Sequence, residues 1–183
     1  MKNLFIGTVL SLALFSGCDN GPQPVTAYAE IVSYDFGYGT PLIGNFIATY
    51  QDGVVTATIY LEGQEDRPVR ALHLHDGTCE TPGNHWNMGH DQQACDLTDM
   101  NGVWDKMYRG DMGNLIVTED GTGSFTLQTD LWSIGTNDST DIVGKLIIVH
   151  FFPTDFSGEC DPSHMPDHTH TNPKLGCGTI NLN

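Results

Sequence analysis

The sequence predicts an all-β domain of eight short antiparallel strands that close into a sandwich or barrel. Runs rich in Val, Ile, Thr, Tyr and Phe alternate with polar or small residues, as half-buried strands do. Clusters of Gly, Pro, Asn and Asp separate these runs, and no segment repeats its apolar residues at the helical period. Eight strands of this kind bury one face by closing on themselves.

Length and charge limit the classes of protein and partner. The chain has 183 residues, enough for one domain with a sizeable core. Asp and Glu number 23 against 7 Lys and Arg, a formal net charge of -16. This balance argues against nucleic acid or an anionic membrane surface as a partner, and it favours solubility.

The first 18 residues predict an export signal. Lys2 precedes an apolar run from Leu4 to Phe15, and Ser16 and Gly17 lead into Cys18. This ending resembles a bacterial lipoprotein signal, which implies lipidation of Cys18 and attachment to a membrane of the cell envelope, in the periplasm. The alternative is an ordinary secretory signal, a soluble secreted protein and an odd thiol at Cys18. Residues 19–24 are expected to form a tether and residues 25–183 the domain.

The strands follow the tether in order. We expect them at Val25–Tyr34, Leu42–Tyr50, Val54–Leu61, Val69–His75, Leu115–Thr118, Gly123–Thr129, Ile142–His150 and Cys177–Leu182. Hairpin turns are predicted at Asp52-Gly53 and at Glu119-Asp120-Gly121, because such pairs supply the positive φ angles that tight turns need.

The fourth strand carries His73 and His75, two positions apart. Side chains alternate along a strand, so both imidazoles share one face while Leu72 and Leu74 turn into the core. With His85 in a Gly/Pro/Asn loop and His150 at the end of the seventh strand, four imidazoles form a tetragonal set that favours Cu(II). The alternative for the pair on the strand alone is an exposed polar face.

Two long stretches, Asp76–Met112 and Phe151–Gly176, exceed the length of ordinary connections and are predicted to be functional loops. Besides His85 they hold His90, His164, His168 and His170. The segment Asp167–His170 lies between Pro166 and Pro173 and is expected to be a solvated turn rather than a metal site.

Export changes the interpretation of the cysteines. Without Cys18 an even set remains, comprising Cys79, Cys95, Cys160 and Cys177. In an oxidising compartment this set predicts disulfides, with three pairings open. A thiolate metal site is the competing interpretation, but the CxxC spacing is absent.

Five motifs resemble the copper,zinc superoxide dismutase family in order and spacing, over about Ala27 to Leu182. They are His73-Leu74-His75, Gly83-Asn84-His85-Trp86-Asn87, Gly110-Asp111-Met112-Gly113-Asn114, the run from Gly144 to His150 and the run from Lys174 to Ile180. The resemblance implies a Greek-key barrel in which Cys79 pairs with Cys177, leaving Cys95 with Cys160.

The resemblance also implies the chemistry. His73, His75, His85 and His150 match the family's copper ligands, and His85 matches the imidazolate that bridges copper to zinc and takes up a proton when copper is reduced. The implied activity is that of a superoxide dismutase, in which Cu(II) oxidises one superoxide anion to dioxygen and Cu(I) reduces a second to hydrogen peroxide.

The zinc side departs from the family. Asp111 and, with a shortened spacing, His90 match zinc ligands beside His85, but Tyr108 stands where a third histidine is expected. Structural zinc takes four protein ligands, so we expect a weak or empty zinc site unless another residue substitutes. The candidates are Asp99, Asp105, His164, His168 and His170.

Two further positions concern substrate access and ligand orientation. Lys174 stands where the resembling family has its channel arginine; lysine keeps the charge but loses the planar fork, so reduced activity is expected. Asp155, one residue out of register, is a candidate for the carboxylate that orients ligand imidazoles.

Two other function classes fit the same residues. A non-catalytic copper-buffering lipoprotein would use the same four histidines, and a structural surface domain would carry them as a vestige. Retention of all four argues against the second of these. A homodimer is compatible with the sequence.

Overall fold

The computed structural model describes residues 21–33, 43–63, 68–86, 109–154 and 172–183. Within these ranges the regular structure is strand throughout, in the elements β1 (Val25–Ser33), β2 (Ile43–Gln51), β3 (Val54–Glu62), β4 (Val69–Gly77), β5 (Pro82–His85), β6 (Asp111–Ile116), β7 (Gly123–Thr129), β8 (Leu146–His150), β9 (Lys174–Thr179) and β10 (Asn181–Leu182). The predicted all-β class is confirmed. None of the described segments forms a helix that could cross a membrane.

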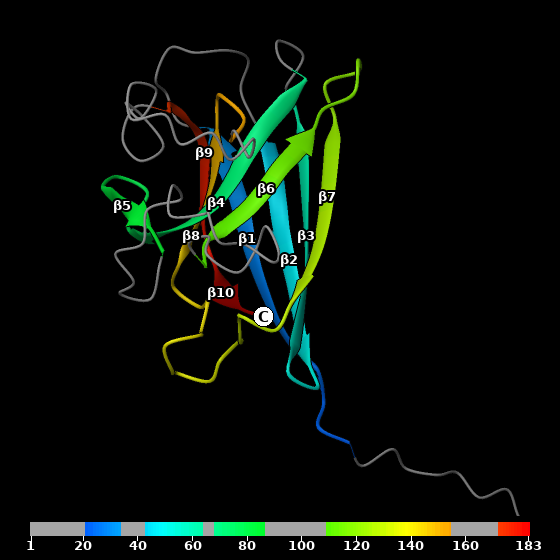
Figure 1. Cartoon of the computed structure of the whole chain (residues 1–183), viewed down its shortest axis with the longest axis vertical. Coiled ribbons are helices and arrows are strands. Elements are labelled where there is room, and N and C mark those ends of the chain that lie inside the picture. The colour runs from blue at the N-terminus through cyan, green and yellow to red at the C-terminus, as the bar shows by residue number, and fades with distance from the viewer. Residues whose placement is uncertain (1–20, 34–42, 64–67, 87–108, 155–171) are drawn as a thin grey trace, which may run out of the picture.

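The strands form one curled antiparallel sheet (Figure 1). Its order is β5-β4-β8-β9-β1-β2-β3-β7; β6 also pairs with β4, on the edge opposite β8, and β10 pairs with β1. A bridge between Val117 and Gly123 joins the end of β6 to the start of β7 and closes the barrel. Because β4 pairs with β8 and β1 with β9, the connections cross as a Greek key does.

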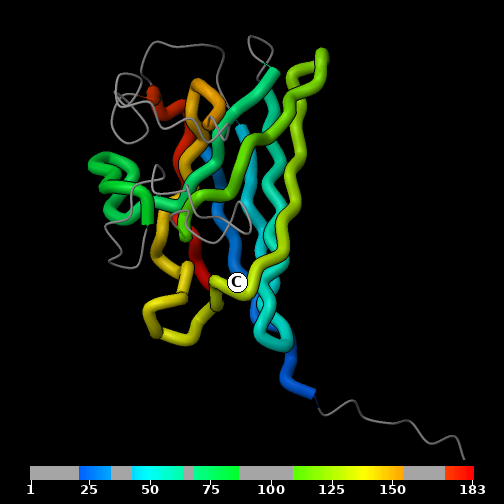
Figure 2. Tube along the Cα trace, viewed as in Figure 1, coloured from blue at the N-terminus to red at the C-terminus, as the bar shows by residue number. Residues whose placement is uncertain are grey.

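The first strand of the chain, β1, lies beside the last two, β9 and β10. Ala27 of β1 pairs with Leu182 of β10, and Val32 pairs with Cys177 of β9. The blue first strand and the red last strands therefore run together in Figure 2. The last strand was expected as one piece from Cys177; it begins instead at Lys174 and is interrupted at Ile180.

Alternation of side chains forms the core. On β4, Leu72 and Leu74 are fully buried in the main apolar cluster, as predicted, together with Phe46, Ile59 and Ile147 from β2, β3 and β8. β8 begins at Leu146, four residues later than expected, because Gly144 adopts a φ of 84° and turns the chain before it. β6 begins at Asp111, earlier than expected, and so includes a predicted site residue.

Several predicted features lie outside the described residues. They are the leader with Cys18, the tether up to Asn20, His90, Cys95, Asp99, Asp105, Tyr108, Asp155, Cys160, His164, His168 and His170.

Candidate metal centre

The four predicted copper ligands meet at one buried place. His73 and His75 come from β4, His85 from the end of β5 and His150 from the end of β8. One ring nitrogen of each lies within 4.8 Å of the others, and none of the residues is more than 7% exposed. Four nitrogens around one ion, each at about 2 Å, span about 4 Å, so this set has the size of a metal site.

β5 was not predicted, because Pro82-Gly83 reads as a loop. A turn at Gly77, with φ 98°, and a hydrogen bond from Thr81 N to Thr78 O bring the chain back antiparallel to β4. His85 thereby lies directly opposite His75.

The pairings of β4 with β6 and of β8 with β9 are irregular where they meet the site. The register shifts between Leu72 and His73 in the β4–β6 pair, so that Asp111 comes opposite His73. It shifts again between Val149 and His150 in the β8–β9 pair, which brings Lys174 opposite His150. Bulges of this kind re-aim side chains beside active sites. The structure thus brings the predicted channel residue Lys174, which is half-buried, to the rim of the histidine cluster.

Gly110 allows β6 to start close to the site. Leu74 N donates to Gly110 O at 2.7 Å, Gly110 N donates to Trp86 O at 2.8 Å and Trp86 N donates to Leu74 O at 2.9 Å. A Cβ at position 110 would collide with the carbonyl oxygen of Leu74. Glycine at this position therefore lets β4, the end of β5 and the start of β6 converge.

Two of the rings have their tautomer fixed by main-chain carbonyls. Nδ1 of His75 donates to Gly83 O at 2.9 Å, and Nδ1 of His150 donates to Asn172 O at 3.1 Å. A carbonyl oxygen only accepts, so in the neutral ring the proton sits on Nδ1 and the lone pair on Nε2.

Burial keeps both rings neutral. It lowers the pKa of His75 to about 3, with smaller contributions from the charges of His85 and Lys174. Burial also lowers the pKa of His150 well below its ordinary value, assisted by the charges of His75 and His85. Neutral imidazoles are the form that binds metals.

The neutral rings leave two lone pairs facing each other. Nε2 of His75 and Nε2 of His150 are 3.3 Å apart. With both protons on Nδ1 this contact cannot be a hydrogen bond, and it is repulsive until a cation lies between the two nitrogens. The residues present therefore fit a metal ion, and the four-nitrogen set is the one that copper(II) prefers.

The other two rings are oriented by side chains. Nδ1 of His85 donates to Oδ1 of Asp111 at 2.9 Å, which leaves Nε2 for a metal. Nε2 of His73 lies 2.9 Å from Oγ1 of Thr154, which leaves Nδ1 to coordinate. Partners of this kind fix ligand orientation and raise metal affinity. Thr154 carries no sequence signal for this role, and Asp155, the candidate named from the sequence, lies outside the described residues.

The zinc set is described only in part. Of the predicted ligands, His85 and Asp111 lie together, while His90 and the position of Tyr108 fall outside the described residues. Asp111 Oδ1 is also 3.9 Å from Nε2 of His73, so this carboxylate lies beside two of the four imidazoles.

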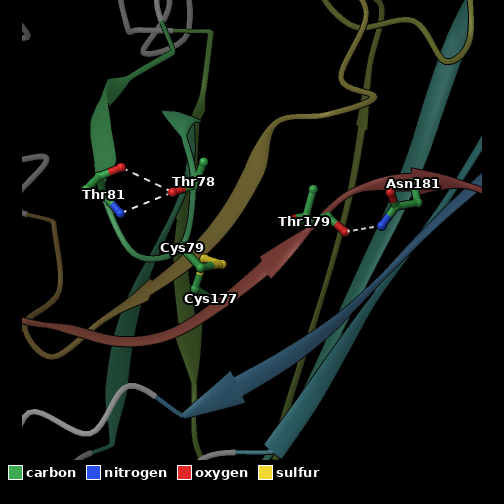
Figure 3. The surroundings of a disulfide bond; sticks show 6 residues. All are labelled: Thr78, Cys79, Thr81, Cys177, Thr179 and Asn181. Atoms are coloured by element: carbon green, nitrogen blue, oxygen red, sulfur yellow. Dashed lines mark hydrogen bonds between the residues drawn. A yellow bond between two sulfur atoms is a disulfide. The ribbon is translucent and has the colours of Figure 1, made fainter.

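One expected disulfide lies behind the site. Cys79, in the turn between β4 and β5, is bonded to Cys177 of β9, as expected, and Cys177 packs with Leu146 and Ile148. Figure 3 shows this bond beside the turn formed by Thr78 and Thr81. The turn that precedes His85 is thus fastened to the barrel wall. Cys95 and Cys160 are outside the described residues.

Comparison with known proteins gives two findings. The family model described as copper/zinc superoxide dismutase (SODC) matches residues 44–180. Among solved structures, the crystal structure of the clock protein EA4 is similar with a TM-score of 0.64 and 24% sequence identity, covering 87% of this chain and 96% of that chain. The second likeness concerns the fold alone.

Proposed function

Because the chain belongs to the copper/zinc superoxide dismutase family, we propose that it is a copper-dependent superoxide dismutase. The observation that carries the proposal is the convergence of four buried imidazoles, two of which have their Nε2 atoms 3.3 Å apart. Copper bound there would supply one-electron transfer, oxidising one superoxide anion to dioxygen and, with two protons, reducing a second to hydrogen peroxide.

The chain's own residues supply orientation, charge and a proton site. Gly83 O, Asn172 O, Thr154 and Asp111 each hold one ring nitrogen and so present the other to the metal. Lys174 offers a cation beside the cluster in a chain whose net charge is -16, and a superoxide anion responds to this local charge. Nδ1 of His85 holds its proton against Asp111, within the centre itself.

Reconstitution tests the proposal. The exported protein, loaded with Cu(II) and dialysed, is expected to hold about one copper per chain and to consume superoxide in a stopped-flow assay. Stoichiometric copper without dismutation would favour the copper-buffering alternative. Failure to bind copper would overturn both.

The proposal includes the location. Lipidation of Cys18 would hold the enzyme at a bacterial membrane in the cell envelope. The intact mass of the exported protein is expected to exceed that of the peptide beginning at Cys18 by its acyl chains. A Cys18→Ser variant, which removes the acceptor thiol, is expected to be released from the membrane fraction; if it remains membrane-bound, the anchor assignment is wrong.

Zinc is expected to bind at least about 100-fold more weakly than it would to a complete four-ligand site. Even residues that only hydrogen-bond to the ligands contribute about 10–100-fold to metal affinity, and here a ligand itself is replaced. The reason is Tyr108 at a ligand position. Titration with a zinc chelator, with copper and activity followed separately, is expected to remove zinc first and leave dismutation in place, because Asp111 still orients His85.

The matched variant for zinc is Tyr108→His, which restores an imidazole and is expected to make zinc resistant to the chelator. Stoichiometric zinc in the unmodified protein under the same chelator would contradict the prediction and identify another ligand. His90, His164, His168 and His170 would then be replaced in turn.

A further inference from the structure

The segment that follows His150 is held by two asparagines from separate elements. Asn114 of β6 donates from Nδ2 to Thr154 O at 2.8 Å and accepts from Thr154 N at 2.8 Å. Asn172, just before β9, donates from Nδ2 to Phe152 O at 2.9 Å and accepts from Phe152 N at 2.9 Å. Each side-chain amide thus engages both main-chain groups of one residue, as a neighbouring strand does.

Each of these two pairs of hydrogen bonds involves a residue that contacts one of the four histidine rings. Thr154, whose main chain is hydrogen-bonded to Asn114, has its Oγ1 2.9 Å from Nε2 of His73. Asn172 itself accepts the Nδ1 hydrogen bond of His150 through its main-chain oxygen, at 3.1 Å. The two asparagines therefore connect to two different rings through two different atoms.

The segment is further fixed at Phe151, the residue just before the two that the asparagines hold. The guanidinium of Arg70, which is fully buried, donates from Nη1 to Phe151 O at 3.0 Å and lies 5.4 Å from the centre of the Phe151 ring. Phe151 N donates to Pro173 O at 2.8 Å. With these main-chain groups held, rotation of Thr154 or of the Asn172 carbonyl requires breaking paired hydrogen bonds rather than one.

We propose that Asn114 and Asn172 are positioning residues of the metal centre. Asn114 sets the His73 ring through Thr154, so that Nδ1 faces the metal; Asn172 sets the His150 ring through its own carbonyl, so that Nε2 faces the metal. The inference rests on the proposed function only in taking these rings as copper ligands, and it assigns a separate residue to the orientation of each.

The test uses metal-free protein first, where activity plays no part. The ¹⁵N chemical shifts of the imidazoles report which nitrogen carries the proton. The full chain is expected to show His150 protonated on Nδ1, because its partner there is a carbonyl oxygen, and His73 protonated on Nε2, because the Asp111 carboxylate lies 3.9 Å from that nitrogen. Asn114→Ala is expected to convert His73 to a mixture of tautomers and leave His150 unchanged, whereas Asn172→Ala is expected to do the reverse.

Three further variants separate orientation from general damage to the fold. Thr154→Val removes the hydroxyl at nearly constant volume and is expected to reproduce the effect of Asn114→Ala on His73, while Thr154→Ser is expected to restore the original shifts. The matched control is Asn181→Ala, whose amide donates to Thr179 O at 2.8 Å near the disulfide (Figure 3), and which is expected to change neither ring.

Copper-loaded protein gives the second readout. Asn114→Ala and Asn172→Ala are each expected to lower copper affinity by about 10–100-fold in a competition assay and to change the parallel hyperfine splitting of the Cu(II) EPR spectrum. Unchanged tautomers in both variants, or equal changes at both rings in both variants, would overturn the proposal. Native tautomers and tight copper without dismutation in the unmodified protein would instead overturn the proposed function and leave this inference standing.

Discussion

Replacing His150 by alanine is expected to reduce superoxide dismutation by more than about 100-fold, because even partners that only orient a ligand contribute 10–100-fold. His150 ends β8, is 3% exposed and supplies one of the two opposed Nε2 lone pairs. Its removal leaves three imidazoles and an open position. The same loss is expected for His73→Ala, which removes the ring held by Thr154.

The measurement pairs copper content with a stopped-flow superoxide assay on each purified variant. The thermal unfolding midpoint of the metal-free protein serves as the check on folding, and Thr58→Val, in an exposed threonine pair with Thr126, serves as the matched control. Full copper and full activity in either histidine variant would show that the ligand assignment is wrong.

Removing the Cys79–Cys177 disulfide is expected to lower the free energy of unfolding by about 3–5 kcal/mol in the chain-entropy description, the lower value applying if Cys95 and Cys160 are also bonded within the loop. The bond links positions separated by 98 residues, and long closed loops restrict the unfolded chain most. Alanine at both positions avoids placing a hydroxyl beside Leu146 and Ile148. Urea unfolding at equilibrium, with and without the substitutions, gives the difference.

Copper affinity shows whether the disulfide also holds the metal site in place. Under conditions where the double variant remains folded, it is expected to bind copper more weakly, because the turn before His85 is no longer fastened to β9.

Peptide mapping of the unmodified chain without reduction is expected to find Cys79 with Cys177 and Cys95 with Cys160. An unchanged urea midpoint in the double variant, or free thiols in the unmodified chain, would contradict the assignment.

The part of the centre that follows from strand period could be predicted from the sequence. His73 and His75 are two positions apart on β4, so they share a face whatever the rest of the chain does, and Leu72 and Leu74 take the core side. The same regularity predicted the all-β class and located the eight expected strands to within about four residues, but it did not indicate β5.

The part that depends on contacts between distant segments could not. Pro82-Gly83 carries no strand pattern, yet β5 forms because the turn at Gly77 and the disulfide return the chain to β4. Thr154, Asn114 and Asn172 are ordinary polar residues in the sequence. Their connection to His73 and His150 exists only once β6, β8 and the start of β9 lie together.

The link between metal binding and folding follows from the pairing of the strands. Ala27 of β1 pairs with Leu182 of β10, and His73 of β4 pairs with Ile148 of β8. Pairs so distant in sequence form slowly, because the entropy of closing a long loop opposes them. β4 on its own places two imidazoles on one strand, half of the set that the folded chain brings together. The full donor set requires β8 to be paired with β4, so copper bound there would stabilise the folded barrel over the unfolded chain.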